Sequence, residues 1–189
     1  LEGFHTPTPL GYRKPEGVPP KHEIQGLTLK PDTTKDIQTL AQQHRITLNT
    51  LIQGTWTVLL GHISGQTDIV FGATTAGRPP TLTGVDTMIG LFINTLPVRV
   101  KLTPDADIIT WMQALQTQRS EARQYEYSPL NQIQKWSEVP TGTPLFDSLI
   151  VFENYRVAQA TSNQTKLTML SEEASRNNSY PLTLRVLPR

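Results

Sequence analysis

The spacing of apolar residues along the chain predicts four helices. The first begins behind a capping hydroxyl at Thr33 or Thr34. Its apolar side is formed by residues that recur every three or four positions, as expected for an amphipathic helix: Ile37, Leu40, Ala41 and His44.

The second predicted helix begins near Thr47 or Asn49 and ends between Gly61 and Gly65. Its apolar residues cover much of its circumference: Leu48, Leu51, Ile52, Trp56, Leu59 and Leu60. A helix that is apolar around so much of its surface is expected to be largely buried.

A third helix is expected to open at Pro104-Asp105, and a short fourth one at Ser128-Pro129, where a proline suits the first helical position. The buried stripe of the third comprises Ile108, Trp111, Met112, Leu115, Arg119 and Ala122, while Gln113, Gln116 and Glu121 face away. The apolar stripe of the fourth helix comprises Leu130, Ile133 and Trp136. The same periodicity assigns all three tryptophans, Trp56, Trp111 and Trp136, to the core.

Short apolar runs between and after these helices predict strands. They cover residues 24–29, 69–73, 92–100, 146–152, 167–170 and 182–187, with a short helical turn from Gly84 to Gly90. Helices that alternate with strands predict an α/β fold in which a mixed sheet packs against helices. Because the last strand runs to the end of the sequence, the sheet is expected to be incomplete at that end.

Residues 1–23 are expected to be extended, because their prolines exclude a helix. Such a segment suits a linker, or an arm that lies along a neighbouring element. The prolines are Pro7, Pro9, Pro15, Pro19 and Pro20.

Charge and composition exclude several classes of function. The chain has 17 basic and 16 acidic residues, so it lacks the basic excess expected of a nucleic-acid-binding domain. It has no cysteine, which excludes disulfides, zinc-thiolate sites and cysteine nucleophiles. No apolar stretch is long enough to span a bilayer and the N-terminal residues do not resemble a signal peptide, so we expect a cytoplasmic protein.

The residues do not form a catalytic motif of their own. There is no phosphate-binding glycine loop and no Gly-x-Ser-x-Gly elbow. The four histidines are scattered, and His44 and His62 are expected to be packing residues on helices. The adjacent Glu172 and Glu173 are expected to form a solvated turn rather than an acid–base pair.

Three polar clusters directly follow or begin predicted strands. Polar groups at strand ends can line a binding cleft, or they can simply cap turns, and the residues alone favour the second interpretation. The clusters are Gly77-Arg78-Pro79, Asn94-Thr95 and Glu153-Asn154-Tyr155.

Several segments, in order along the chain, resemble the condensation domains of non-ribosomal peptide synthetases. The most specific is the run from Ile89 to Arg99, IGLFINTLPVR, which is similar to the family's Ile/Val-Gly-x-Phe-Val-Asn-Thr motif and its following arginine. The others are the opening Leu1 to Leu10, Asp68 to Gly72 with Gly77-Arg78-Pro79, Tyr125 to Leu130, Pro144 to Asp147 and Phe152 to Tyr155.

The resemblance implies a fold of two lobes, each similar to chloramphenicol acetyltransferase. Residues 24–189 would be the C-terminal lobe, incomplete at its C-terminus, and residues 1–23 the linker between lobes. It implies amide-bond formation between two thioesters bound to carrier proteins. The family's catalytic motif, His-His-x-x-x-Asp-Gly, belongs to the first lobe and is absent from this chain. We therefore expect no catalytic residue and no activity from these residues alone.

By the same resemblance, this lobe would supply one wall of the substrate tunnel and docking surface for carriers. It would bind no cofactor or metal directly, because the phosphopantetheine arms are carried by the donor and acceptor carrier domains. Further partners would be the first lobe and an adjacent adenylation domain, with no nucleic acid or membrane. The candidate tunnel or phosphopantetheine contacts are Arg78, Asn94, Thr95, Arg99, Ser148, Phe152, Glu153, Asn154 and Tyr155.

For some of these residues a structural role competes with the functional one. Asn94 and Thr95 can fix a strand end through side-chain hydrogen bonds. Arg78 and Arg99 suit a phosphate, but each can instead pair with a carboxylate or with backbone carbonyls. Three other functions stay open: an epimerisation-domain lobe, a catalytically silent carrier-binding module, and a stand-alone acyltransferase that uses coenzyme A.

Overall fold

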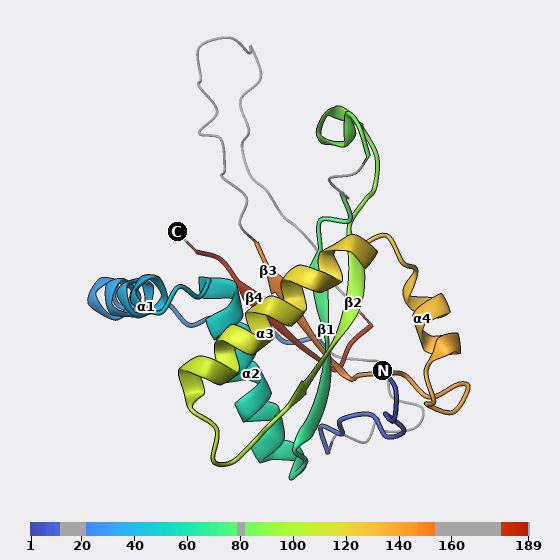
Figure 1. Cartoon of the computed structure of the whole chain (residues 1–189), viewed down its shortest axis with the longest axis horizontal. Helices are drawn as coiled ribbons and strands as arrows, with labels where there is room; N and C mark the ends of the chain where they lie inside the picture. Colours follow the sequence, from blue (N-terminus) through green and yellow to red (C-terminus); the bar gives the residue numbers. More distant parts are fainter. Residues whose placement is uncertain (12–21, 79–81, 154–178, 189) are drawn as a thin grey trace.

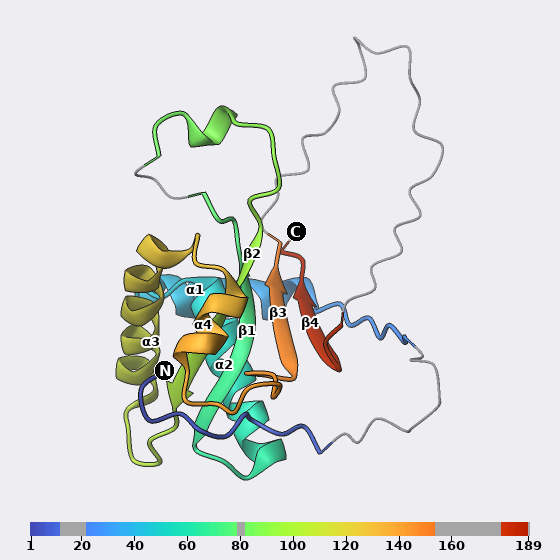
Figure 2. The ribbon, with the colours of Figure 1, turned by 90° about the vertical axis from the view of Figure 1, so that its right-hand side faces the viewer.

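The computed structural model describes residues 1–11, 22–78, 82–153 and 179–188 as a four-stranded sheet packed between helices (Figures 1 and 2). The helices are α1 (Pro31–Gln43), α2 (Leu48–Ser64), α3 (Ile108–Ala122) and α4 (Leu130–Trp136), with 3-10 turns η1 (Val85–Thr87) and η2 (Arg123–Tyr125). The strands are β1 (Asp68–Thr75), β2 (Asn94–Lys101), β3 (Ser148–Phe152) and β4 (Leu182–Val186). The predicted α/β fold with a mixed sheet is confirmed.

The strands lie in the order β2-β1-β3-β4. Strand β1 is central: Gly72 is opposite Pro97 of the antiparallel β2 and opposite Leu149 of the parallel β3. Strand β4 extends the sheet parallel to β3. Pro97 is tolerated because β2 is an outer strand of the described sheet, where a missing N–H breaks no ladder.

Alternate residues of β1 pack on opposite faces of the sheet. Phe71 points to the side covered by Leu60 of α2 and Leu115 of α3. Val70 points to the other side, where residues from the N-terminus and from the segment before β3 cover it. A strand buried on both faces has a continuous apolar sequence, which is why 69–73 was recognisable as a strand.

Capping groups set the helix boundaries. The Thr47 side chain accepts a hydrogen bond from the Thr50 N–H at 3.0 Å, and Gly65 ends α2 with φ of 69°, so the predicted limits of this helix are confirmed. Helix α1 begins earlier than expected, at Pro31, whose fixed φ suits a first turn. Helix α3 begins later, because Asp107 rather than Pro104 caps it, accepting from the Thr110 N–H at 2.8 Å.

The first residues of the chain are extended, as predicted, and pack on the sheet beside them. The Phe4 ring is 3% exposed, within the cluster that covers Val70. Thr8 bridges to Phe146, and its hydroxyl accepts a hydrogen bond from the Val70 N–H at 2.8 Å. Residues 12–21 of the predicted arm lie outside the described residues.

Several expectations about exposure were wrong. Trp136 is 72% exposed, because it is the last residue of the short helix α4, at the periphery of the sheet. Helix α2 is buried on the side that carries Trp56 and Leu60, as expected, but Leu59 of the same predicted set is 45% exposed. His62 is exposed near the end of the same helix. Trp56 is buried and Trp111 is partly buried, as expected.

Two further expectations failed because they depended on distant partners. Residues 24–29 are extended but unpaired rather than a strand, since no described segment lies beside them in hydrogen-bonding register. Gln116 does not face away: its amide carbonyl accepts from the Thr47 N–H at 2.7 Å, and its NH2 donates to the Arg45 carbonyl at 3.0 Å. The predicted strand at 167–170 lies outside the described residues. No described helix has the length and apolar character needed to cross a membrane.

Candidate functional site

The sheet register separates the predicted site residues into two groups. Asn94 is opposite Thr75 at the end where β1 finishes, and Phe152 is opposite Val186 where β3 and β4 finish. The predicted contacts Asn94, Thr95, Phe152 and Glu153 therefore share one end of the sheet, which we call the upper end (Figure 1). Arg99 and Ser148 lie away from it, and Asn154 and Tyr155 lie outside the described residues.

Asn94 fixes the start of β2. Its side-chain NH2 donates to the carbonyl oxygens of Glu126 at 2.9 Å and Ser128 at 2.7 Å, in the connection between η2 and α4. Both donors of the amide are used, so the structural role anticipated for this residue is confirmed. Thr95 is half-buried opposite Thr74 and borders the same strand end.

Arg78 is committed to the loop that joins β1 and β2, residues 76–93, which we call the β1–β2 loop. Its guanidinium donates to the carbonyls of Val85 and Met88, the latter at 3.0 Å, and lies 4.1 Å from the centre of the Phe92 ring. These contacts confirm the expected pairing with backbone carbonyls. They brace the loop internally, since one side chain joins both of its sides.

A glycine allows the two sides of this loop to approach. Gly77 has φ of 63°, and a Cβ there would lie 1.7 Å from the Phe92 carbonyl oxygen. No other residue could occupy this position without moving the backbone. In the predicted Gly-Arg-Pro cluster, Gly77 therefore permits the close approach of the two sides of the loop, and Arg78 joins them by hydrogen bonds.

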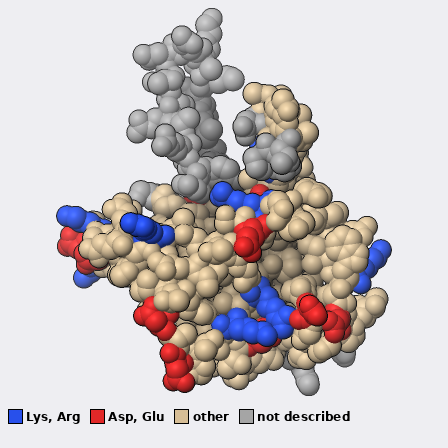
Figure 3. Space-filling model, in the orientation of Figure 1, with Lys and Arg blue, Asp and Glu red and all other residues tan. Residues whose placement is uncertain are grey.

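The β1–β2 loop projects beyond the upper end of the sheet (Figures 1 and 2). Its described part is mostly uncharged at the surface (Figure 3), and Leu91 is 90% exposed. An apolar loop that is braced internally and still exposed is typical of a surface that contacts a partner. The exposed apolar residues of its described part are Leu82, Met88, Ile89, Leu91 and Ile93.

Glu153 closes the ladder between β3 and β4 at the upper end. Its N–H donates to the Val186 carbonyl at 2.9 Å, and its carboxylate accepts from both the Nε and a terminal NH2 of Arg185, each at 2.5 Å. The carboxylate is therefore neutralised by a guanidinium on the neighbouring strand. This pairing orients Glu153 and leaves Phe152, which is half-buried, as its neighbour at the strand end.

Arg99 lies toward the opposite end of the sheet and pairs with Asp68. Its Nε donates to one carboxylate oxygen at 2.9 Å and a terminal nitrogen to the other at 2.6 Å. Hydrogen bonding to Arg99 holds the pKa of the Asp68 carboxyl below its ordinary value. The predicted pairing with a carboxylate is confirmed.

Ser148 is 2% exposed at the start of β3, so its side chain belongs to the interior of the fold. Burial also raises the pKa of the neighbouring Asp147 carboxyl. Among the described residues, no group of histidine, aspartate or glutamate side chains is arranged to hold a metal ion. The described residues of the upper end offer hydrogen-bonding groups and apolar surface.

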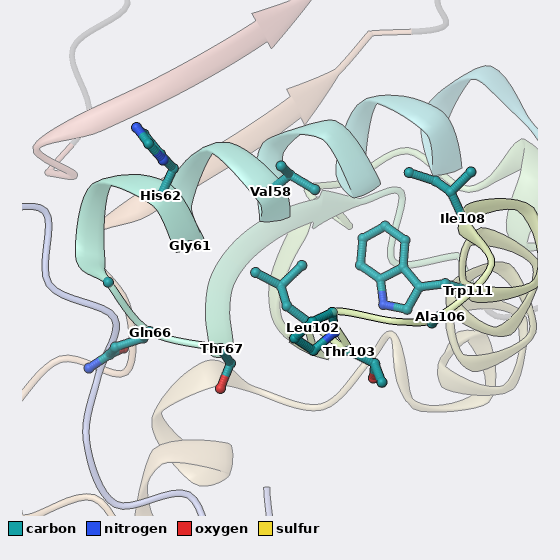
Figure 4. A pocket seen from close by; sticks show the side chains of 12 residues that line it. Val58, Gly61, His62, Gln66, Thr67, Leu102, Thr103, Ala106, Ile108 and Trp111 are labelled. Atoms are coloured by element: carbon teal, nitrogen blue, oxygen red, sulfur yellow. The ribbon is translucent and has the colours of Figure 1, made fainter.

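The structure contains two apolar grooves that the sequence did not predict. The larger, of about 550 Å³, lies between the end of α2 and the connection from β2 to α3 (Figure 4). A second, of about 340 Å³, borders the outer side of β2 and is flanked by Tyr125 and Trp136. Neither could have been found from periodicity, because each is bordered by segments far apart in sequence. The second coincides with Trp136, which had been assigned to the core.

Comparisons with known proteins place these features in a family. Residues 3–189 match the model of the condensation domain. The chain is 46% identical over 188 residues to one of the linear gramicidin synthase proteins of Brevibacillus parabrevis, covering 97% of this chain and 4% of that protein. It is 34% identical over 197 residues to surfactin synthase subunit 2 of Bacillus subtilis (strain 168), covering 100% of this chain and 5% of that protein.

The fold is also similar to a solved structure, the first condensation domain of the CDA synthetase. The two share a TM-score of 0.58 and 15% sequence identity, over 68% of this chain and 29% of the other. This likeness concerns the fold alone, whereas the family match extends over nearly all of the residues. The chain belongs to the condensation-domain family.

Proposed function

We propose that this chain is the C-terminal lobe of a condensation domain that forms amide bonds between carrier-bound aminoacyl or peptidyl thioesters. The similarity to two peptide synthases supports this activity, although the chain spans only about one-twentieth of their length. The lobe contributes a tunnel wall and docking surface, and the other lobe contributes the histidine motif. On this proposal, residues 1–23 connect the two lobes.

The observation that carries the lobe assignment is the projecting β1–β2 loop. Ile89 and Leu91 of this loop are almost completely exposed, whereas Arg78 joins described parts of the loop by hydrogen bonds. Exposed side chains on a loop of fixed shape are suited to contact a second surface whose shape is also fixed. We assign that surface to the first lobe, because the chain has no adjacent histidines and needs a catalytic group from elsewhere.

The reaction requires an amine and a thioester to meet in line, and positioning can contribute much of the rate. Two phosphopantetheine arms, borne by the donor and acceptor carrier domains, would bring them together. Thr95, Phe152 and Glu153 would border their path at the upper end, with Asn154 and Tyr155 continuing from β3. A histidine of the first lobe would orient or deprotonate the amine.

The test is condensation by the intact synthetase with aminoacyl thioesters loaded on its carriers. The double substitution Ile89→Asp with Leu91→Asp should lower the single-turnover rate by about 100-fold, because misplacing the lobes misaligns the reactants. Ile108→Asp, which places one negative charge on an exposed apolar site of α3, is the control and should change the rate little. Unchanged condensation in the loop variant, or product from the 189-residue chain alone, would overturn the lobe assignment.

Stereochemistry separates this function from epimerisation, which the resemblance to the family also allows. A condensation domain joins two carrier-bound groups, so the mass of the acceptor-bound product increases. An epimerisation domain inverts a stereocentre of one carrier-bound peptide and leaves its mass unchanged. Chiral chromatography of the released product, together with its mass, therefore decides between them.

A further inference from the structure

Two aromatic side chains are exposed on the outer side of β2. Tyr125, in η2, is 56% exposed, and Trp136, the last residue of α4, is 72% exposed. Both border the groove of about 340 Å³, which Leu96 and Ile133 also line. Aromatic side chains that stay exposed around an apolar groove are typical of a surface that binds a partner.

The edge of β2 beside this groove is poorly suited to pairing with another strand. The Arg99 carbonyl oxygen accepts a hydrogen bond from Gln118 Nε2 of α3 at 2.8 Å. The Lys101 carbonyl oxygen accepts one from Trp111 Nε1 of the same helix at 2.9 Å. Pro97 lies two residues before Arg99, so its backbone faces the same side, where it has no N–H to donate. A further strand therefore cannot form a regular ladder along this part of β2.

The size and chemistry of the groove favour a proline-rich extended segment. An α-helix is about 10–12 Å wide with its side chains, and the groove is too small to bury the apolar face of one. A polyproline II segment needs no backbone ladder, because it has no internal hydrogen bonds and its prolines lack N–H groups. Its rings pack on aromatic side chains, while the Tyr125 hydroxyl and the Trp136 indole N–H can donate to its carbonyl oxygens.

We propose that a proline-rich segment of the synthetase polypeptide, from outside these 189 residues, docks in this groove as a polyproline II helix. The relatives named above extend far beyond the matched region, so such a segment can belong to the same polypeptide. Linkage to this fold then raises its effective concentration at the groove. The contact holds a neighbouring part of the synthetase against α4 and β2. This inference rests on the described surface and is independent of the reaction proposed above.

Photochemical cross-linking in the intact synthetase identifies the occupant. Trp136→p-benzoylphenylalanine places a photoreactive aromatic ring at the groove, and digestion with mass spectrometry identifies the captured peptide. We expect a proline-rich peptide from outside the 189 residues, and loss of the cross-link when its prolines are replaced by alanine. The same replacement at Leu40, which is 42% exposed on α1, is the control and should not capture that peptide. Capture of a carrier-domain helix, or of no segment outside these residues, would overturn the proposal.

A matched pair of tyrosines tests the groove itself. In the cross-linking variant at Trp136, Tyr125→Ala should abolish capture of the proline-rich peptide, because the groove loses one of its two exposed aromatic walls. Tyr127→Ala is the control, since Tyr127 is similarly exposed, at 65%, but does not line the groove. Equal capture in these two variants would contradict docking at this position. Condensation activity is not the readout, so failure here is distinct from failure of the proposed function.

Discussion

Arg99 of β2 and Asp68 of β1 form a two-pronged ion pair across neighbouring strands, with nitrogen–oxygen distances of 2.9 and 2.6 Å. The same guanidinium donates to the carbonyl of Glu2 at 2.5 Å and lies 5.3 Å from the centre of the Phe4 ring. One side chain thereby joins the sheet to the first residues of the chain. These contacts help to hold the first residues of the chain against the sheet.

We predict that Arg99→Lys weakens this attachment although it keeps the charge. A lysine cannot make the two parallel hydrogen bonds and also reach the Glu2 carbonyl. The expected loss is about 1 kcal/mol in the free energy of unfolding, because the pair is partly solvated. Urea titration of the chain measures it, and Lys101→Arg, at an exposed site on the same strand, is the control. A loss no greater than that of the control would contradict the attachment.

The Asp68 pair also predicts a pH dependence. The lowered pKa of Asp68 means that its stabilising contribution is present above the unfolded pKa and is lost as pH falls through the folded pKa. Stability should therefore decline in acid, as the pH falls below the ordinary value of 3.8, with a contribution that Asp68→Asn abolishes. Urea titrations of both proteins between pH 7 and about pH 3 would show this. Identical acid slopes would exclude Asp68 as a contributor.

Phe4 should be a major stabilising residue despite its position near the start of the chain. Its side chain is 3% exposed and packs with Val70 and Phe146. Phe4→Ala is expected to lower the free energy of unfolding by about 3–5 kcal/mol, through lost burial and a cavity. The adjacent exposed His5→Ala should change it by less than about 0.5 kcal/mol. Equal stability of the two variants would show that the first residues are dispensable.

Gly72 should not tolerate alanine, because the Phe146 ring packs directly on it. An added Cβ would lie 2.4 Å from Phe146 Cε2 and 3.0 Å from Leu149 Cδ1. Gly72→Ala is expected to cost about 1–3 kcal/mol through overpacking in the middle of β1. Gly26→Ala is the control, since a Cβ there meets nothing within 4 Å. If thermal unfolding shows equal midpoints, the ring must be able to move aside.

Asn94→Ala should loosen the connection between η2 and α4 without unfolding the rest of the fold. The substitution leaves the carbonyls of Glu126 and Ser128 without their amide donor, with an expected cost of about 1–3 kcal/mol. Asn131→Ala, on the exposed side of α4, is the control. Amide exchange of residues 126–130 should increase only in the first variant. Increased exchange in neither variant would contradict the structural role of Asn94 and leave its side chain free for a substrate contact.

The site was only partly predictable from the sequence, for a physical reason visible in Arg78 and Arg99. An arginine near a strand suits a phosphate, a carboxylate or a carbonyl equally well, and the choice depends on which group the fold brings within reach. Arg78 meets carbonyls of its own loop, whereas Arg99 meets a carboxylate one strand away. The positions of Arg78 and Arg99 in the sequence do not predict either of these partners.

What the sequence alone determined were the elements whose signals are local. Thr47 and Gly65 set the limits of α2, and the apolar run at 69–73 identified β1, because caps and side-chain periodicity act within a few residues. Only the tertiary structure decided that Trp136 is exposed, that Phe4 is buried and that residues 24–29 join no strand of the described sheet. Burial and strand pairing depend on segments distant along the chain, and a residue's own pattern cannot specify whether such a partner is present.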